Sequence, residues 1–215
     1  LLDDTVVNHE ILVLIGEQGL YKTTWFNFLL PPELRCYFYT KTNSDRLNKD
    51  DLFSLTEFAL ICFEELDGMR PAELNQLKAM VTMPYVNERA AYGRNKERHP
   101  HIASFCGTGN NVQFLTDPTG NRRWLPFEVS QIRDPHLHAI PYELVYSQAY
   151  ALWKSGFCHW FSQEEIRKLN MHNSRFEVPN LEEDLIRTHF RKPFEGEAGI
   201  FVTAADILEQ ISSCL

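Results

Sequence analysis

Short apolar runs alternate with amphipathic stretches along the first two thirds of the chain. The runs at 10–15, 59–63 and 102–106 are mostly apolar, which is typical of buried strands. Between them, 22–30 and 71–81 repeat apolar residues at helical spacing; two prolines end the first of these helices, and Pro71 lies in the first turn of the second. A further strand is indicated near the end of 114–129. Strands that alternate with helices predict an α/β sheet.

The pattern changes after residue 133. Residues 142–154 and 162–170 predict helices, 199–202 predicts a short strand, and Thr203 with Asp206 predicts the capped start of a last helix. We therefore expect two domains, an α/β domain over 1–133 and a smaller, mainly helical, winged-helix-like domain over 134–215.

Composition narrows the class of protein. The chain has 215 residues, of which 44% are hydrophobic and 23% charged, so it can bury a core and is not of the disordered or fibrous class. Its longest apolar run is too short to span a bilayer, so we expect no membrane partner. The five cysteines are scattered without C-x-x-C spacing, which predicts reduced thiols and a cytoplasmic protein. Because the chain does not begin with Met, we expect a fragment of a longer protein.

A net charge of -8 argues against a surface that is basic throughout and made for nucleic acid. One segment is nevertheless basic: 87–101 predicts a hairpin that turns at 93–95 and carries four cations, Arg89, Arg94, Lys96 and Arg98, against two acids. Such cations can displace the counterions of a nucleic-acid backbone, and Tyr92 can stack on a base. A solvated charged edge is the alternative interpretation.

The segment IGEQGLYKTTW, 15–25, joins the first predicted strand to the first predicted helix. It matches the phosphate-binding pattern G-x-x-x-x-G-K-[ST] except that Tyr21 stands where a glycine is usual. We expect Lys22 to reach the β- and γ-phosphates of ATP, Thr23 to ligate Mg²⁺, and Tyr21 to lie already in the helix with its ring outward. The expected nucleotide-binding residues are Gly16, Glu17, Gln18, Gly19, Leu20, Tyr21, Lys22, Thr23 and Thr24. A strand–turn–helix joint with a solvated lysine remains the alternative.

Three later segments carry polar residues that fit the same chemistry. In FEELD, Glu64 suits a metal site and Glu65 suits the activation of water, with Asp67 further along the turn. In GTGNN, Asn110 can orient that water, and Asn111 is the second choice. In DPTGNRRW, Arg122 and Arg123 suit the charge on a transferring phosphoryl group, supplied from a neighbouring subunit. Taken singly, surface acids, a turn and a surface arginine pair would explain these segments.

In their order, GEQGLYKTT, FEELD, QLKAMVT, the basic hairpin, GTGNN and FLTDPTGNRRWLPFEV resemble the virulence-associated protein E family over roughly 8–130. That family is similar to superfamily 3 helicases, which are P-loop ATPases related to the AAA+ group. The resemblance implies a P-loop NTPase fold and a helicase-type ATPase that uses ATP and Mg²⁺ in the replication of phage or mobile-element DNA. It also implies a homo-oligomeric ring on single-stranded DNA and an upstream primase-type region.

The resemblance further assigns roles to residues. It implies Walker A roles for Lys22 and Thr23, Walker B roles for Glu64 and Glu65, a sensor role for Asn110, and DNA contacts within 89–99. An arginine finger is implied at Arg122 or Arg123, and the choice between them stays open. Two other functions also stay open: a non-catalytic nucleotide- or DNA-binding assembly module whose loop is degenerate at Tyr21, and a small-molecule kinase.

Overall fold

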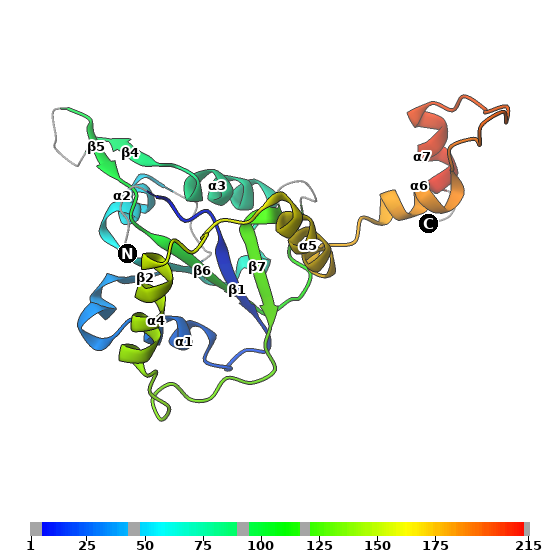
Figure 1. Cartoon of the computed structure of the whole chain (residues 1–215). Coiled ribbons are helices and arrows are strands. Elements are labelled where there is room, and N and C mark those ends of the chain that lie inside the picture. The colour runs from blue at the N-terminus through cyan, green and yellow to red at the C-terminus, as the bar shows by residue number, and fades with distance from the viewer. Residues whose placement is uncertain (1–5, 43–47, 90–94, 117–120, 213–215) are drawn as a thin grey trace. The chain divides into compact units, whose positions relative to one another are not determined.

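A computed structural model of the chain describes residues 6–42, 48–89, 95–116 and 121–212. Its contacts divide the chain into two compact units, 1–177 and 178–215. The first unit contains a five-stranded, fully parallel sheet in the order β2-β3-β6-β1-β7 (Figure 1). Its strands are β1 (Ile11–Ile15), β2 (Phe38–Lys41), β3 (Leu60–Phe63), β6 (Ser104–Gly109) and β7 (Trp124–Glu128). The predicted α/β sheet is confirmed.

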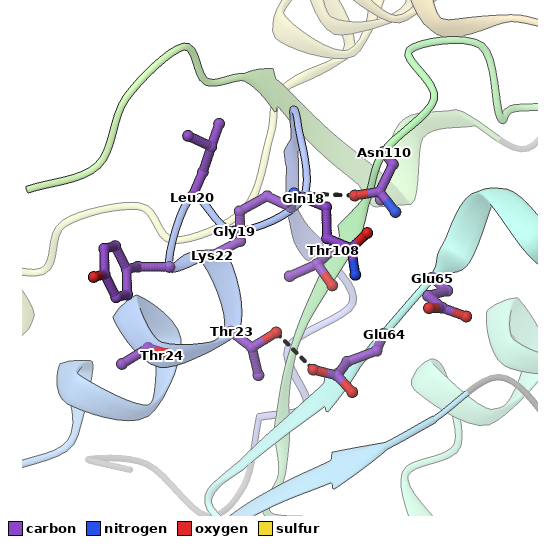
Figure 2. Close-up of a pocket in the computed structure, with 12 residues that line it drawn as sticks. Gln18, Gly19, Leu20, Lys22, Thr23, Thr24, Glu64, Glu65, Thr108 and Asn110 are labelled. Carbon is purple, nitrogen blue, oxygen red and sulfur yellow. Dashed lines mark hydrogen bonds between the residues drawn. The ribbon is translucent and has the colours of Figure 1, made fainter. Parts of the chain in front are cut away.

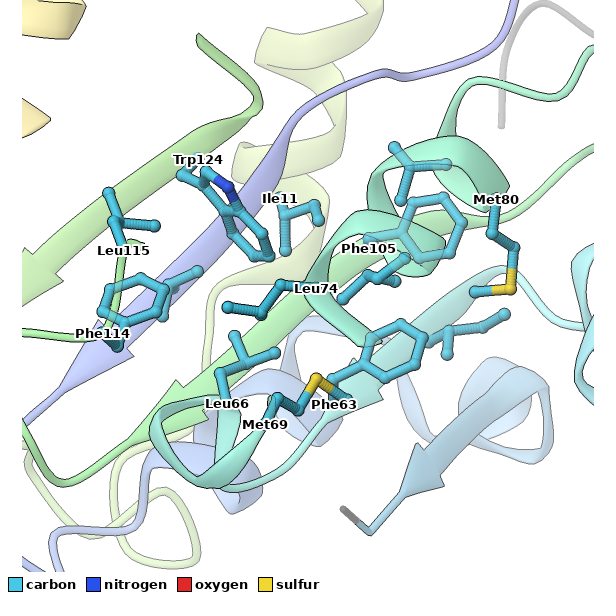
Figure 3. Packing of buried hydrophobic residues seen from close by; sticks show 14 of the residues in the cluster. Ile11, Phe63, Leu66, Met69, Leu74, Met80, Phe105, Phe114, Leu115 and Trp124 are labelled. Atoms are coloured by element: carbon cyan, nitrogen blue, oxygen red, sulfur yellow. The ribbon is translucent and has the colours of Figure 1, made fainter. Parts of the chain in front are cut away.

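Helices cover both faces of this sheet, which is why its central strands are apolar on both sides. Helices α2 (Lys49–Glu57) and α3 (Pro71–Val81) cover one face, where Trp124, Phe63 and Leu74 belong to the larger buried cluster (Figure 3). Helix α1 (Lys22–Leu29) covers the other face, where Phe26 packs with residues of β1, β3 and β6. The helices predicted at 22–30 and 71–81 are thus confirmed.

The strand order determines where a ligand can bind. The connection from β1 to β2 passes over β6 and β3, whereas the later connections step back toward β1 and beyond it to β7. Because parallel crossovers are right-handed, these opposite directions place the helices on opposite faces. The order therefore reverses beside β1, and ligands of open α/β sheets bind at such a reversal, outside the carboxyl ends of the strands.

A two-stranded antiparallel hairpin, β4 (Tyr85–Glu88) and β5 (Glu97–Pro100), stands between α3 and β6. This confirms the hairpin predicted within 87–101, whose tip at 90–94 lies outside the described residues. Side chains alternate along its strands, so that Tyr85 and Asn87 are exposed while Val86 is buried toward the body of the unit.

Two more helices complete the first unit. Helix α4 (Tyr142–Lys154) is tied to the end of α1, where Tyr142 Oη donates to the Phe28 carbonyl at 2.6 Å. Helix α5 (Gln163–Asn173) is tied to β7, because Asn173 Nδ2 donates to the carbonyls of Asn121 (2.8 Å) and Trp124 (2.9 Å). These bonds carry the first unit on to residue 177, well past the boundary expected near residue 133.

The second unit contains α6 (Leu181–His189) and α7 (Ala204–Ser212), which contact each other. The predicted cap is confirmed: Thr203 Oγ1 and its backbone N–H both donate to Asp206 Oδ2. Residues 199–202 are irregular, however, and the strand expected there is wrong. Ile200 and Phe201 are each 90% exposed and pair with no described strand, so the described part of the unit gives no support for a winged helix. None of the described helices is both long and apolar enough to cross a membrane.

Candidate functional site

A cavity of about 450 Å³ opens at the carboxyl ends of β1, β3 and β6, beside the reversal of the strand order (Figure 2). It brings together three of the segments that the sequence singled out, the loop before α1, the acidic turn after β3 and the end of β6. The lining residues are Gln18, Gly19, Leu20, Tyr21, Lys22, Thr23, Thr24, Glu64, Glu65, Thr108, Gly109 and Asn110. Thr108 and Gly109 were not predicted, although both stand in GTGNN beside Asn110.

Lys22 lies at the start of α1 with its side chain almost fully buried by the loop. Its Nζ donates to the carbonyls of Gly16 and Glu17, both at 2.7 Å, and to Asn110 Oδ1 at 3.2 Å. Burial lowers the pKa of Lys22 from its ordinary value, and the negative charge of Asp67 acts in the opposite direction. The loop thus wraps an ammonium group that faces the end of β6.

Tyr21 is not helical, contrary to expectation. It precedes α1 in the left-handed region, at φ 59° and ψ 21°, and its side chain is 43% exposed. An L-residue with a side chain is disfavoured there by roughly 1–2 kcal/mol, because its Cβ crowds the following carbonyl. Tyr21 therefore adopts the left-handed backbone conformation that glycine usually supplies at this position of the loop.

Thr23 and Glu64 come from neighbouring elements of the cavity wall. Thr23 Oγ1 donates to Glu64 Oε1 at 2.7 Å. Glu64 directly follows β3, and its backbone N–H donates to the carbonyl of Lys41 at the end of β2 (2.9 Å). The next residue, Glu65, also has a positive φ of 55°, which turns the chain sharply away from the strand. A hydroxyl and a carboxylate, both hard oxygen groups, thus meet at one point.

The end of β6 is held by the acidic turn. Asp67 Oδ1 accepts a hydrogen bond from the Asn110 N–H, and Asp67 Oδ2 accepts one from the Asn111 N–H, both at 3.1 Å. Asn110 faces the cavity, whereas the Asn111 side chain accepts a hydrogen bond from the Gln113 N–H and does not line it. Of these two asparagines, Asn110 is therefore the one that lines the cavity.

Arg122 and Arg123 lie away from this cavity within the chain. They form a short 3₁₀ turn just before β7, and Trp124 pairs with Ile11 at the amino end of β1. The loop with Lys22 follows the carboxyl end of β1, one five-residue strand away, or about 16 Å. Arg122 is exposed at this opposite edge of the sheet, and Arg123 is half-buried. The structure does not bring the two arginines to the site of their own chain.

The sequence profile of the virulence-associated protein E-like domain matches residues 3–178. The chain belongs to this family. The matched range ends one residue after the first compact unit, so the virulence-associated protein E-like domain includes α4 and α5 as well as the sheet. No curated protein sequence gives a significant match.

Solved structures similar to this virulence-associated protein E-like domain include three of the NrS-1 C-terminal region, all without ligand. One A-form structure is 12% identical with a TM-score of 0.44, covering 79% of this chain and 34% of that one. Another apo structure is 13% identical with a TM-score of 0.45, covering 78% and 35%. A further A-form structure is 14% identical with a TM-score of 0.44, covering 87% and 44%. The chain thus spans less than half the length of these structures.

The hairpin of the virulence-associated protein E-like domain has two unlike faces. Arg98 lies over the ring of Tyr85, with 3.6 Å from Cζ to the ring centroid, on the exposed face that also carries Asn87. The other face carries buried Val86 and the half-buried Glu88 and His99. Arg89 and Lys96 are exposed beyond the strand ends, and Arg94 lies outside the described residues.

Proposed function

We propose that the chain is a Mg²⁺-dependent ATPase. The observation that carries the proposal is the meeting, around one cavity, of the buried Lys22 ammonium, the Thr23–Glu64 contact and Asn110. A triphosphate needs a cation at its β- and γ-phosphates and backbone N–H groups at a helix start, and the loop before α1 supplies both. This arrangement supports a P-loop NTPase fold, and Glu65 is the proposed activator of water.

The residues present fit a magnesium ion. Within the described part of the chain, no three His, Cys, Asp or Glu side chains gather into a metal site of their own. Mg²⁺ in nucleotide sites is held by one or two protein oxygens together with phosphates and waters. Thr23 and Glu64 can supply the protein oxygens. Bound there, the ion would neutralise charge on the phosphates while Lys22 orients them and Asn110 orients the attacking water.

The test is ATP hydrolysis by the whole chain with and without Mg²⁺, for wild type and Lys22→Ala. We expect Lys22→Ala to lower hydrolysis roughly 100-fold or more, since it removes a charged donor at the reacting phosphates. Lys168→Ala is the matched control, because Lys168 is an exposed lysine on α5 paired with Glu164. Hydrolysis that survives Lys22→Ala would refute the assignment.

We further propose that the ATPase works on single-stranded DNA as part of a ring. The hairpin supports the DNA contact, because Arg98, Lys96 and Arg89 are exposed there and Arg98 stacks on Tyr85 in an otherwise acidic chain. Membership of the virulence-associated protein E-like family supports a helicase-type role in the replication of phage or mobile-element DNA. The position of Arg122 at the far edge of the sheet supports an arginine finger that acts on the neighbouring subunit.

Tyr21 supports a second candidate, a nucleotide-binding module without catalysis. Its positive φ adds strain at the point where the loop must wrap phosphate. Titration with a non-hydrolysable ATP analogue, run beside the ATPase assay, separates these candidates. Analogue binding without turnover of ATP favours the nucleotide-binding module, and no Mg²⁺-dependent binding indicates a decayed site and excludes both the ATPase and the nucleotide-binding module.

A further inference from the structure

Asp67 connects the acidic turn after β3 to the end of β6, where Asn110 lines the cavity. Asp67 itself does not line the cavity. Its carboxylate accepts hydrogen bonds from two successive backbone N–H groups, those of Asn110 and Asn111, each at 3.1 Å. A carboxylate that accepts two N–H bonds is held in one orientation, and so is the backbone that donates them. Asp67 thereby fixes the residue whose Oδ1 accepts from Lys22 Nζ at 3.2 Å.

The surroundings of Asp67 are built around this contact. A Cβ at Gly109 would lie 3.0 Å from Asp67 Oδ1, which is closer than an ordinary contact, so the carboxylate would have to move slightly to admit a side chain there. One residue before Asp67, Leu66 is fully buried, and a Cβ at Gly107 would lie 2.3 Å from its Cδ1. The turn after β3 therefore packs closely against β6 at both of these glycines, with Leu66 against Gly107 and Asp67 against Gly109.

We infer that Asp67 is a positioning residue that sets Asn110 relative to Lys22 and couples Asn110 to the turn bearing Glu64 and Glu65. This inference rests on the proposed ATPase. Since Glu64, Glu65 and Asp67 share one short turn, a shift of the acids moves the carboxylate that carries Asn110. Asp67 therefore keeps Asn110 at a fixed position relative to Glu64 and Glu65, on the other side of the proposed phosphate site.

The test is Asp67→Asn in the whole chain. An amide in place of the carboxylate keeps one acceptor but sets its own NH₂ group against the second N–H, so the clamp opens at one side. With Asn110 displaced, we expect kcat to fall by up to about 100-fold while KM changes little. We also expect faster hydrogen exchange at the Asn110 and Asn111 amides in NMR spectra. Asp67→Glu, which keeps both acceptors, should recover part of kcat.

Asp134→Asn is the matched control, since Asp134 also accepts a backbone N–H, that of His136, and does not line the cavity. Unchanged kcat for Asp67→Asn beside an active wild type would overturn the inference and leave the ATPase standing. Unchanged exchange at both amides would overturn it whatever the activity. A wild type that neither binds nor hydrolyses ATP would instead overturn the proposed function, and with it the positioning role given to Asp67.

Discussion

Thr23 on the first turn of α1 donates a hydrogen bond to Glu64 at the end of β3, over 2.7 Å between Oγ1 and Oε1. The two residues are 41 positions apart and meet because β1 and β3 end at the same edge of one parallel sheet. Parallel strands thus bring a hydroxyl and a carboxylate together at the place where the proposed Mg²⁺ binds.

Thr23→Ala is predicted to raise the Mg²⁺ concentration needed for half-maximal hydrolysis, because the ion loses an oxygen ligand. Loss of the bond to Glu64 should also destabilise the fold by about 1 kcal/mol. A Mg²⁺ titration of the ATPase rate measures the first effect and urea unfolding the second. Thr188→Ala, an exposed threonine on α6 that does not line the cavity, is the comparison. Equal Mg²⁺ dependence in all three proteins would contradict the metal role of Thr23.

Tyr21→Gly is predicted to stabilise the protein modestly, by about 0.5–1 kcal/mol, since relief of the left-handed strain outweighs the entropy glycine adds to the unfolded chain. Tyr21→Ala keeps a Cβ and hence the strain, so it separates the backbone effect from loss of the ring. Denaturant unfolding and ATP-analogue titration of both variants are the measurements. Tighter binding by the glycine variant alone would show that the tyrosine compromises the loop, and equal binding that it is tolerated.

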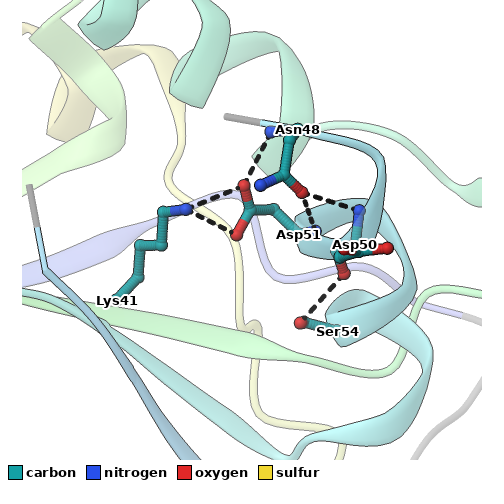
Figure 4. A network of polar contacts seen from close by, with 5 residues as sticks. All are labelled: Lys41, Asn48, Asp50, Asp51 and Ser54. Atoms are coloured by element: carbon teal, nitrogen blue, oxygen red, sulfur yellow. Dashed lines mark hydrogen bonds and ion pairs between the residues drawn. The ribbon is translucent and has the colours of Figure 1, made fainter. Parts of the chain in front are cut away.

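Lys41 and Asp51 form a buried ion pair, 3.0 Å apart, between the end of β2 and the first turn of α2 (Figure 4). Asp51 also accepts from the Asn48 N–H at 2.7 Å. Lys41→Met is predicted to destabilise the fold by about 3–5 kcal/mol, because it leaves a buried carboxylate without its cation. Adding Asp51→Leu should recover much of this loss in a double-mutant cycle of unfolding free energies. Strictly additive losses would contradict a direct coupling.

His101 gives a pH dependence to folding. It is almost fully buried just after β5, its Nδ1 lies 2.7 Å from the Met83 carbonyl, and its ring meets Phe105 edge-on. Burial lowers the pKa of His101 below 6.5 in the folded protein, so the unfolded chain binds the proton more readily. Its stabilising contribution is present above pH 6.5 and is lost as pH falls toward the folded pKa, by at most about 1.4 kcal/mol per pH unit.

Unfolding free energies of wild type and His101→Leu between pH 5 and pH 8 measure this effect. The difference between the two proteins should shift in favour of the variant as pH falls below about 6.5. Parallel pH curves would contradict the assignment to His101.

The exposed hairpin face is predicted to bind single-stranded DNA. Arg98→Ala should weaken binding and reduce the slope of log affinity against log salt by about 1, as loss of one phosphate contact does. Tyr85→Ala should cost about 1–3 kcal/mol with a smaller change in salt slope, because stacking is not ionic. Arg133→Ala, an exposed arginine outside the hairpin, is the charge-matched control. Equal losses for Arg98→Ala and Arg133→Ala would indicate a diffuse charge effect.

Much of the sheet could be predicted from the sequence, and the missed elements show what limits such prediction. Strand β2 gives no clear signal in the sequence, because its four residues are only partly apolar and end in Lys41. Helix α2 carries a local start signal, since Asn48 and Asp51 form a capping box, yet little of its sequence is strongly apolar. The extent of the first unit is not visible in the sequence, because the bonds from Asn173 to Asn121 and Trp124 cross about fifty residues.

The residues placed at the cavity were predictable because strand ends share one edge of a parallel sheet, so Lys22, Glu64 and Asn110 had to approach one another. The conformation of Tyr21 was not, because a positive φ in a side-chain-bearing residue is imposed by closure of the whole loop. The role of Asp67 was equally hidden, since only the folded chain shows that its carboxylate meets the backbone of a strand end 43 positions away.

Arg122 lies at the amino ends of the strands and Lys22 at their carboxyl ends. This placement affects how many complete sites an assembly of chains contains. If the arginine serves the next subunit, contacts are head-to-tail, with a different surface used on each side. An open row of n chains then completes n − 1 sites, a closed ring completes n, and a lone chain completes none. Turnover per chain would climb with protein concentration and level off once rings close.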